Sequence, residues 1–143
     1  RTGNTSTGVW TACNAVTVPE WTPTMATLWQ HWKDHLFYAV ALDFRPDATP
    51  VVTCTTCLGV NGAGTWAAVV MFSGSRLGAL NQTRDEPPMN TDTRSVIGNY
   101  LEGRNASNHP NVAGNGDYQS AAASSSFNDI LFCIDATLSV TPC

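Results

Sequence analysis

With 143 residues, 43% of them hydrophobic, the chain is long enough to bury the core of one ordinary globular domain, which we expect to span residues 1–143. A formal net charge of −4 and a single lysine, Lys33, leave no basic cluster to neutralise phosphates and argue against a nucleic-acid partner. No apolar run reaches the roughly 20 residues of a membrane-spanning helix, so we expect no transmembrane segment, signal peptide or anchor. The opening residues 1–4 have the look of a processed end.

The first part of the chain predicts an irregular segment followed by a short helix. Residues 1–23 are rich in Thr, Pro and Gly, with room for one short strand at 15–18. Thr24 can cap a helix. The apolar residues after it recur at spacings of three and four and form one stripe: Met25, Leu28, Trp29, Trp32 and Leu36.

Three apolar runs in the middle of the chain predict strands. Residues 36–44 form the first, which Pro46 ends because proline cannot donate to a strand ladder. Residues 51–60 and 64–74 are joined by an Asn-Gly-Ala-Gly hairpin signal, so we expect them to pair antiparallel. The run 64–74 has almost no polar alternation, which predicts the central strand of the sheet with both faces covered.

The second half is mostly irregular. Asp92 can cap a short helix that Gly103 would end, and residues 105–126 predict a long functional or mobile loop. Residues 127–134 predict the last strand, and the tail after them can add an edge strand. The sequence therefore predicts an α+β fold with a four-stranded antiparallel sheet, short helices and long loops.

Five cysteines, an odd number, predict two disulfides and one free thiol: Cys13, Cys54, Cys57, Cys133 and Cys143. Disulfides and a surface rich in Ser, Thr and Asn favour an extracellular location. We favour a Cys54–Cys57 bridge, although three residues apart on a regular strand they would point to opposite faces and would need a bulge or turn. Cys13 would then compete with Cys133 for Cys143. No second C-x-x-C is present to complete a zinc site, and the motif lies in a Thr-rich strand rather than at a helix start.

Other constellations favour packing or turn chemistry over catalysis. His31 and His35 could share a helical face, but the glutamate of H-E-x-x-H is missing. Ser73 lies outside a G-x-S-x-G elbow because Phe72 takes the first glycine position. Oxygen ligands at 115–117 and 128–129 lack the spacing of a calcium loop. We therefore expect no metal, no cofactor and no enzymatic activity. Sequons begin at Asn4, Asn81 and Asn105 and matter only where the source glycosylates.

Several motifs taken together resemble the C-terminal head of type IV pilin-like proteins, the minor pilins and pseudopilins. They lie at residues 32–40, 57–62, 67–74, 99–105 and 127–131, so the resemblance covers about residues 29–135. It implies an antiparallel sheet packed on a long N-terminal helix, a C-terminal disulfide, no catalysis, and a role in a cell-surface filament or its tip. The prepilin cleavage site and apolar N-terminal helix of that family are missing from this sequence.

The resemblance and the residues together set the expected partners. Since two runs are apolar on both faces, we expect an apolar helix from another polypeptide or a removed N-terminus to cover one sheet face, with Trp29 and Trp32 covering only part of it. Other subunits of a homo-oligomeric filament would meet the loop 105–126, with Tyr118 as its anchor. The alternatives are a secreted carbohydrate- or surface-binding module with exposed loop aromatics, and a secreted enzyme.

Overall fold

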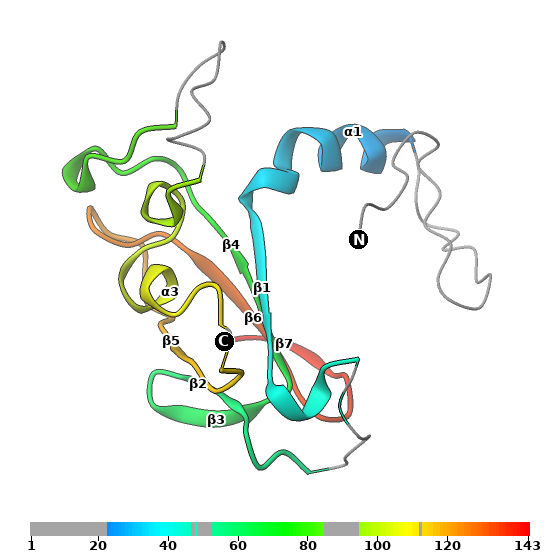
Figure 1. Ribbon diagram of the computed structural model, residues 1–143. Coiled ribbons are helices and arrows are strands. Elements are labelled where there is room, and N and C mark those ends of the chain that lie inside the picture. The colour runs from blue at the N-terminus through cyan, green and yellow to red at the C-terminus, as the bar shows by residue number, and fades with distance from the viewer. Residues whose placement is uncertain (1–22, 47, 49–52, 85–94, 112) are drawn as a thin grey trace. The chain divides into compact units, whose positions relative to one another are not determined.

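The computed structural model describes residues 23–46, 48, 53–84, 95–111 and 113–143 (Figure 1). Two compact units divide the chain, Arg1–Asp34 and His35–Cys143. The predicted strand at 15–18, Asp92 and Cys13 lie outside the described residues.

The described part of the first unit is helical. Helix α1 spans Pro23–Trp32, with proline at its first position, where a missing N–H costs nothing. Thr24 therefore lies inside the helix rather than at its cap. A 3₁₀ turn, η2, covers Lys33–His35, and strand β1 starts at Leu36. Leu36 thus belongs to a strand and not to the helical stripe predicted from its spacing.

The second unit is built on a four-stranded antiparallel sheet, which confirms the predicted α+β fold. Its strands are β1 (Leu36–Val40), β4 (Ala68–Phe72), β6 (Ile130–Ile134) and β7 (Val140–Pro142), in the order β1-β4-β6-β7 (Figure 1). Strand β4 is central, as predicted, and pairs antiparallel with both β1 and β6. The tail contributes the edge strand β7.

A second, three-stranded sheet has the order β3-β2-β5, with β2 at Leu58–Val60, β3 at Ala63–Trp66 and β5 at Asp117–Tyr118. The predicted hairpin is present, because β2 and β3 pair antiparallel around Asn61 and Gly62, both at positive φ. The predicted antiparallel pairing of runs 51–60 and 64–74 is therefore confirmed at Leu58 and Trp66, but it does not extend into the central strand β4.

The physical reason is that the chain changes sheets at Ala67. Trp66 still pairs with Leu58, whereas the Ala67 N–H donates to the Ile134 carbonyl and its carbonyl accepts from Ala41 N–H, each at 2.8 Å. The apolar run 64–74 is therefore two strands, β3 and β4, and β4 takes its neighbours from distant parts of the chain.

The helix predicted before Gly103 is absent from the described residues there, which contain a single 3₁₀ turn, η5 (Ile97–Asn99). Gly103 instead begins α3 (Gly103–Ser107). Glu102 between them is extended because its N–H donates to the Asp129 carboxylate at 3.0 Å, which stops helical propagation. The remaining 3₁₀ turns are η3 (Leu42–Phe44) and η4 (Gly78–Leu80).

The core lies between the main sheet on one side and strand β2, strand β5 and the segment before α3 on the other. The inward-facing residues of the main sheet pack against Leu58, Leu101 and Tyr118. These inward-facing residues are Ala39, Val69, Met71, Leu131 and Cys133. Tyr118 is fully buried.

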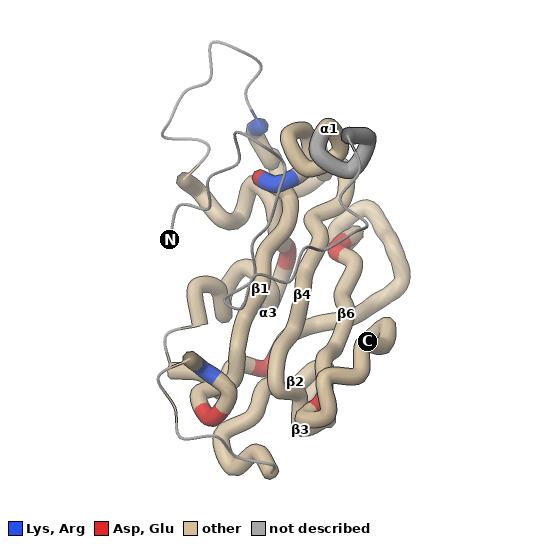
Figure 2. The backbone as a smooth tube through the Cα atoms, turned by 90° about the vertical axis from the view of Figure 1, so that its right-hand side faces the viewer, with Lys and Arg blue, Asp and Glu red and all other residues tan. Residues whose placement is uncertain are grey.

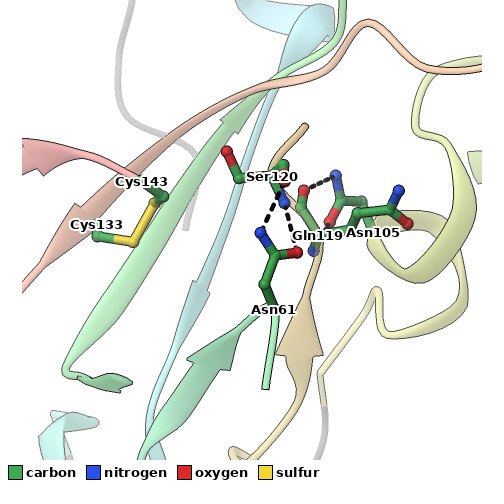
Figure 3. The surroundings of a disulfide bond; sticks show 6 residues. All are labelled: Asn61, Asn105, Gln119, Ser120, Cys133 and Cys143. Carbon is green, nitrogen blue, oxygen red and sulfur yellow. Dashed lines mark hydrogen bonds between the residues drawn. A yellow bond between two sulfur atoms is a disulfide. The ribbon is translucent and has the colours of Figure 1, made fainter. Parts of the chain in front are cut away.

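Polar side chains hold the described part of the loop predicted at 105–126. The Asn105 amide donates to the Gln119 carbonyl at 3.0 Å and accepts from Gln119 N–H at 2.8 Å (Figure 3). The Asn61 amide makes the same two-way contact with the backbone of Ser120 (Figure 3). Amide side chains therefore hold the described part of this segment together with buried Tyr118.

Candidate interaction surface

One side of the main sheet is covered by the core and the other side carries a continuous set of apolar residues, which we call the outer face. Side chains alternate between the two sides of a strand, so residues 37, 39, 69, 71, 131 and 133 point to the core. The residues between them form the outer face: Leu36, Tyr38, Val40, Ala68, Val70, Phe72, Ile130, Phe132 and Ile134, extended by Val140 and Pro142 of β7.

The strand register arranges the outer face in rows. Tyr38 lies opposite Val70, and Val70 lies opposite Phe132, so these three residues cross β1, β4 and β6 in one line. A second row runs through Leu36, Phe72 and Ile130, and a third through Val40, Ala68 and Ile134. Directly opposed side chains in an antiparallel sheet contact one another, so the rows form one surface.

This surface is uncharged and open to solvent. Tyr38 is 68% exposed, Ile130 53% and Phe132 40%. Figure 2 shows β1, β4 and β6 side by side, and none of these strands carries a charged residue. Exposed apolar patches of this kind on a folded domain mark sites of protein contact. The exposure agrees with the expectation that one sheet face lacks a cover from the described residues of its own unit.

Beneath the sheet, on the core side, a buried polar network joins three chain segments. The Gln82 amide donates to Glu102 Oε1 at 2.7 Å, and Asn128 N–H donates to Glu102 Oε2 at 3.0 Å. Asp129 Oδ2 accepts from Glu102 N–H at 3.0 Å and from the Asn105 amide at 2.9 Å. The network fixes the segments before α3 and before β6 to each other, and therefore sets where β6 enters the sheet.

The network places two carboxyl groups side by side in the interior. Burial, in the first place, raises the pKa of Asp129 to about 7; the Glu102 charge and a hydrogen bond to Glu102 that only protonated Asp129 can donate add to the rise. Hydrogen bonds from Glu102 N–H and Asn105 oppose it. Arg84 interacts electrostatically with both carboxylates, but burial lowers its own pKa. Asp129 is therefore a group whose charge changes near neutral pH inside the fold.

Of the described residues weighed for catalysis and metal binding, the structure brings His35 and Ser73 together. His35 Nδ1 lies 2.9 Å from Ser73 Oγ, but Ser73 is fully buried and cannot meet a substrate. His31 is in α1, in the other unit from His35. The Asp117 carboxylate is occupied by Arg104 and by Gly62 N–H. Within the described ranges, no group of three or more His, Cys, Asp or Glu residues could hold a metal ion.

Two disulfides join four of the five cysteines: Cys54–Cys57 and Cys133–Cys143. Figure 3 shows the second of them. The favoured Cys54–Cys57 bridge is confirmed, but it closes a turn before β2 rather than a strand. Asp43 accepts the N–H groups of Thr55 and Thr56 within that turn. Cys143 pairs with Cys133 and not with Cys13. Disulfides of this kind are typical of a secreted or extracellular protein.

Of the three side chains expected at interfaces, two lie in the first unit and the third lies in the core of the second unit. Trp29 and Trp32 lie in α1 of the first unit, where Trp32 is exposed. Tyr118, expected to anchor a partner, is fully buried in its own core, so it holds its own loop and presents no surface. The sequence predicted that one sheet face would lack a cover, but it did not single out Tyr38 and Phe132 as the exposed side chains of that face.

None of the helices in the described part of the chain has the length and apolarity required to cross a bilayer. Comparison with models of protein families, with curated proteins and with solved structures finds no match to this chain. The outer face, the network and the disulfides are therefore the observations from which a function can be argued.

Proposed function

We propose that this chain is a structural, non-enzymatic subunit of an extracellular type IV pilus-like filament or of its tip, whose outer face is covered by an apolar helix in the assembly. The observation that carries the proposal is the uncharged outer face of β1, β4 and β6. The motif resemblance to pilin-like heads supports it, because heads of that family pack a sheet on a helix.

The dimensions of the outer face suit a helix. Neighbouring strands lie about 4.8 Å apart, so β1, β4 and β6 span roughly 10 Å from first to third axis. A helix with its side chains is about 10–12 Å across, which matches that width. Because the three rows carry no charge, the side of the helix that contacts them has to be apolar.

The occupant we propose is a helix of another polypeptide or of a segment preceding Arg1. The buried network supports such a role, since it fixes β6 through side chains that water does not reach, and the two disulfides suit an oxidising environment. The head would then be a rigid body that joins the filament through one face.

A charge on the outer face tests the proposal. We expect Phe132→Asp to fold, because the side chain is exposed, but to be missing from filaments isolated from producing cells, because the helix would bury an unpaired carboxylate. Thr65→Asp, on the exposed part of β3 in the other sheet, is the matched control and should assemble normally. Equal incorporation of both variants would reject the proposal.

The alternative of a carbohydrate-binding module receives no specific support. It requires exposed aromatic side chains on long loops, whereas Tyr100 and Tyr118 are both buried.

A further inference from the structure

Strand β1 is one edge of the main sheet, and the backbone N–H and C=O groups of three of its five residues point away from the sheet. Ser73 N–H donates to the His35 carbonyl at 2.9 Å, and Ala41 N–H donates to the Ala67 carbonyl at 2.8 Å. Since hydrogen-bonded pairs alternate along an antiparallel ladder, residues 37 and 39 also bond to β4. The N–H and C=O groups of residues 36, 38 and 40 point outward and meet no partner among the described residues.

The two edge strands of the main sheet, β7 and β1, differ in the features that prevent pairing with another chain. Strand β7, at one edge, carries Pro142 and is tied down by the Cys133–Cys143 disulfide, both of which discourage pairing with another chain. Strand β1 contains no charge, no proline and no bulge across Leu36–Val40. Natural proteins protect exposed edges with such devices, so an edge without them is suited to strand addition.

We propose that β1 pairs antiparallel with β1 of a second copy of this chain, about a two-fold axis at Tyr38. In this register Tyr38 lies opposite Tyr38 of the second copy, and Leu36 lies opposite Val40. The outward N–H and C=O groups of all three residues then exchange hydrogen bonds, and the rows of the outer face continue across the junction. The surface is self-complementary, as a two-fold interface requires.

The chemistry of the edge favours a second copy over an unrelated chain. Leu36, Tyr38 and Val40 offer no charge that a different partner could complement. An added strand has to be apolar at alternate residues and to have outward backbone groups of its own, and β1 meets both requirements. The pairing goes beyond the proposed function, since it uses the edge of β1 and leaves the outer face on β4 and β6 accessible.

Proline at the centre of β1 tests the pairing. The Tyr38 N–H makes no bond to β4, so Tyr38→Pro should keep the fold while blocking the added strand. Tyr38→Thr, which keeps the N–H and suits a strand, is the matched control. Sedimentation velocity over a concentration series should show a dimer for the wild type and Tyr38→Thr, with affinity at least 10-fold weaker for Tyr38→Pro. A monomeric wild type at every concentration would overturn the proposal.

Cysteine crosslinking fixes the register and stays informative if the proline variant fails to fold. In a Cys13→Ser background, Tyr38→Cys should form a disulfide-linked dimer, because directly opposed Cα atoms lie about 5.5 Å apart. Leu36→Cys should not, since its counterpart lies four residues away, roughly 13 Å along the strand. Equal crosslinking at both positions contradicts the register.

One further result separates this interface from the helix site. Phe132→Asp lies two strands from the edge and should leave the dimer intact even where it abolishes assembly. A dimer that is lost in Phe132→Asp but kept in Tyr38→Pro would mean that copies associate through their outer faces, and would overturn strand pairing.

Discussion

The buried carboxyl of Asp129 predicts that this fold is more stable in weak acid than in weak base. Folding raises the pKa of Asp129 from 3.8 to about 7, so the folded protein binds that proton more tightly than the unfolded chain does. The buried charge of ionised Asp129 therefore destabilises the fold. This destabilisation is fully present above pH 7, decreases as the pH falls through 7, and is gone below about 4. At full strength such a rise costs about 4 kcal/mol above pH 7, and partial solvent screening reduces this to ~2 kcal/mol.

Asp129→Asn removes the charge and keeps the contacts. The amide oxygen can still accept from Glu102 N–H and Asn105, and the amide N–H can donate to the Glu102 carboxylate. We expect the variant to be more stable than the wild type by ~2 kcal/mol at pH 8, about 5 °C in Tm for a chain of this size. At pH 5 the advantage should fall to less than half of that, because folded Asp129 is protonated there while the unfolded chain, with a pKa of 3.8, is still ionised.

Urea unfolding of both proteins at pH 5 and pH 8 measures this difference. Burial lowers the pKa of His109 and opposes the trend, but it acts on both proteins and cancels in the comparison. Asp135→Asn is the control: hydrogen bonds from Thr137 and Ser139 lower the pKa of Asp135, so it is ionised at both pH values. A variant less stable than the wild type at pH 8, or equally stabilised at both pH values, would refute the reasoning.

Three further changes test the packing. Cys143→Ala opens the Cys133–Cys143 bridge, whose sequence separation is 10, and should lower the free energy of unfolding in urea by about 3 kcal/mol. Asn105→Ala leaves the Gln119 backbone unpaired and should cost ~2 kcal/mol and expose the segment after it to proteases, whereas Ser107→Ala, on the exposed side of α3, should do neither. Met71→Ala creates a cavity in the fully buried core and should lower the free energy of unfolding by about 2–5 kcal/mol.

Three strands of the main sheet were predictable because β1, β4 and β6 lie in apolar runs. The run 51–60, expected among its strands, instead contributes β2 to the other sheet. The central position of β4 followed from the lack of polar alternation, and the β2–β3 hairpin followed from Asn61 and Gly62, which tolerate positive φ. The change of sheets at Ala67 could not be predicted, because it depends on backbone bonds to Ala41 and Ile134, which are distant in sequence.

The polar part of the fold was beyond sequence reasoning for a similar reason. Amide residues in 105–126 suggest a solvated loop, and only the fold brings Asn105 against Gln119 and Asp129. The outer face was partly predictable: apolar residues on both sides of β4 require a second cover, but which side remains exposed depends on where the loops pack. The role of Tyr118 was mispredicted for the same reason. From sequence alone, an aromatic residue in a polar loop can be an interface anchor or a core residue.

Electron cryomicroscopy of the native assembly tests the central claim, that the outer face receives a helix, most directly. We expect filaments in which an apolar helix crosses β1, β4 and β6 and contacts the row of Tyr38, Val70 and Phe132. Filaments that contain this subunit with the row still facing solvent, or a native sample without any filament, would contradict the account.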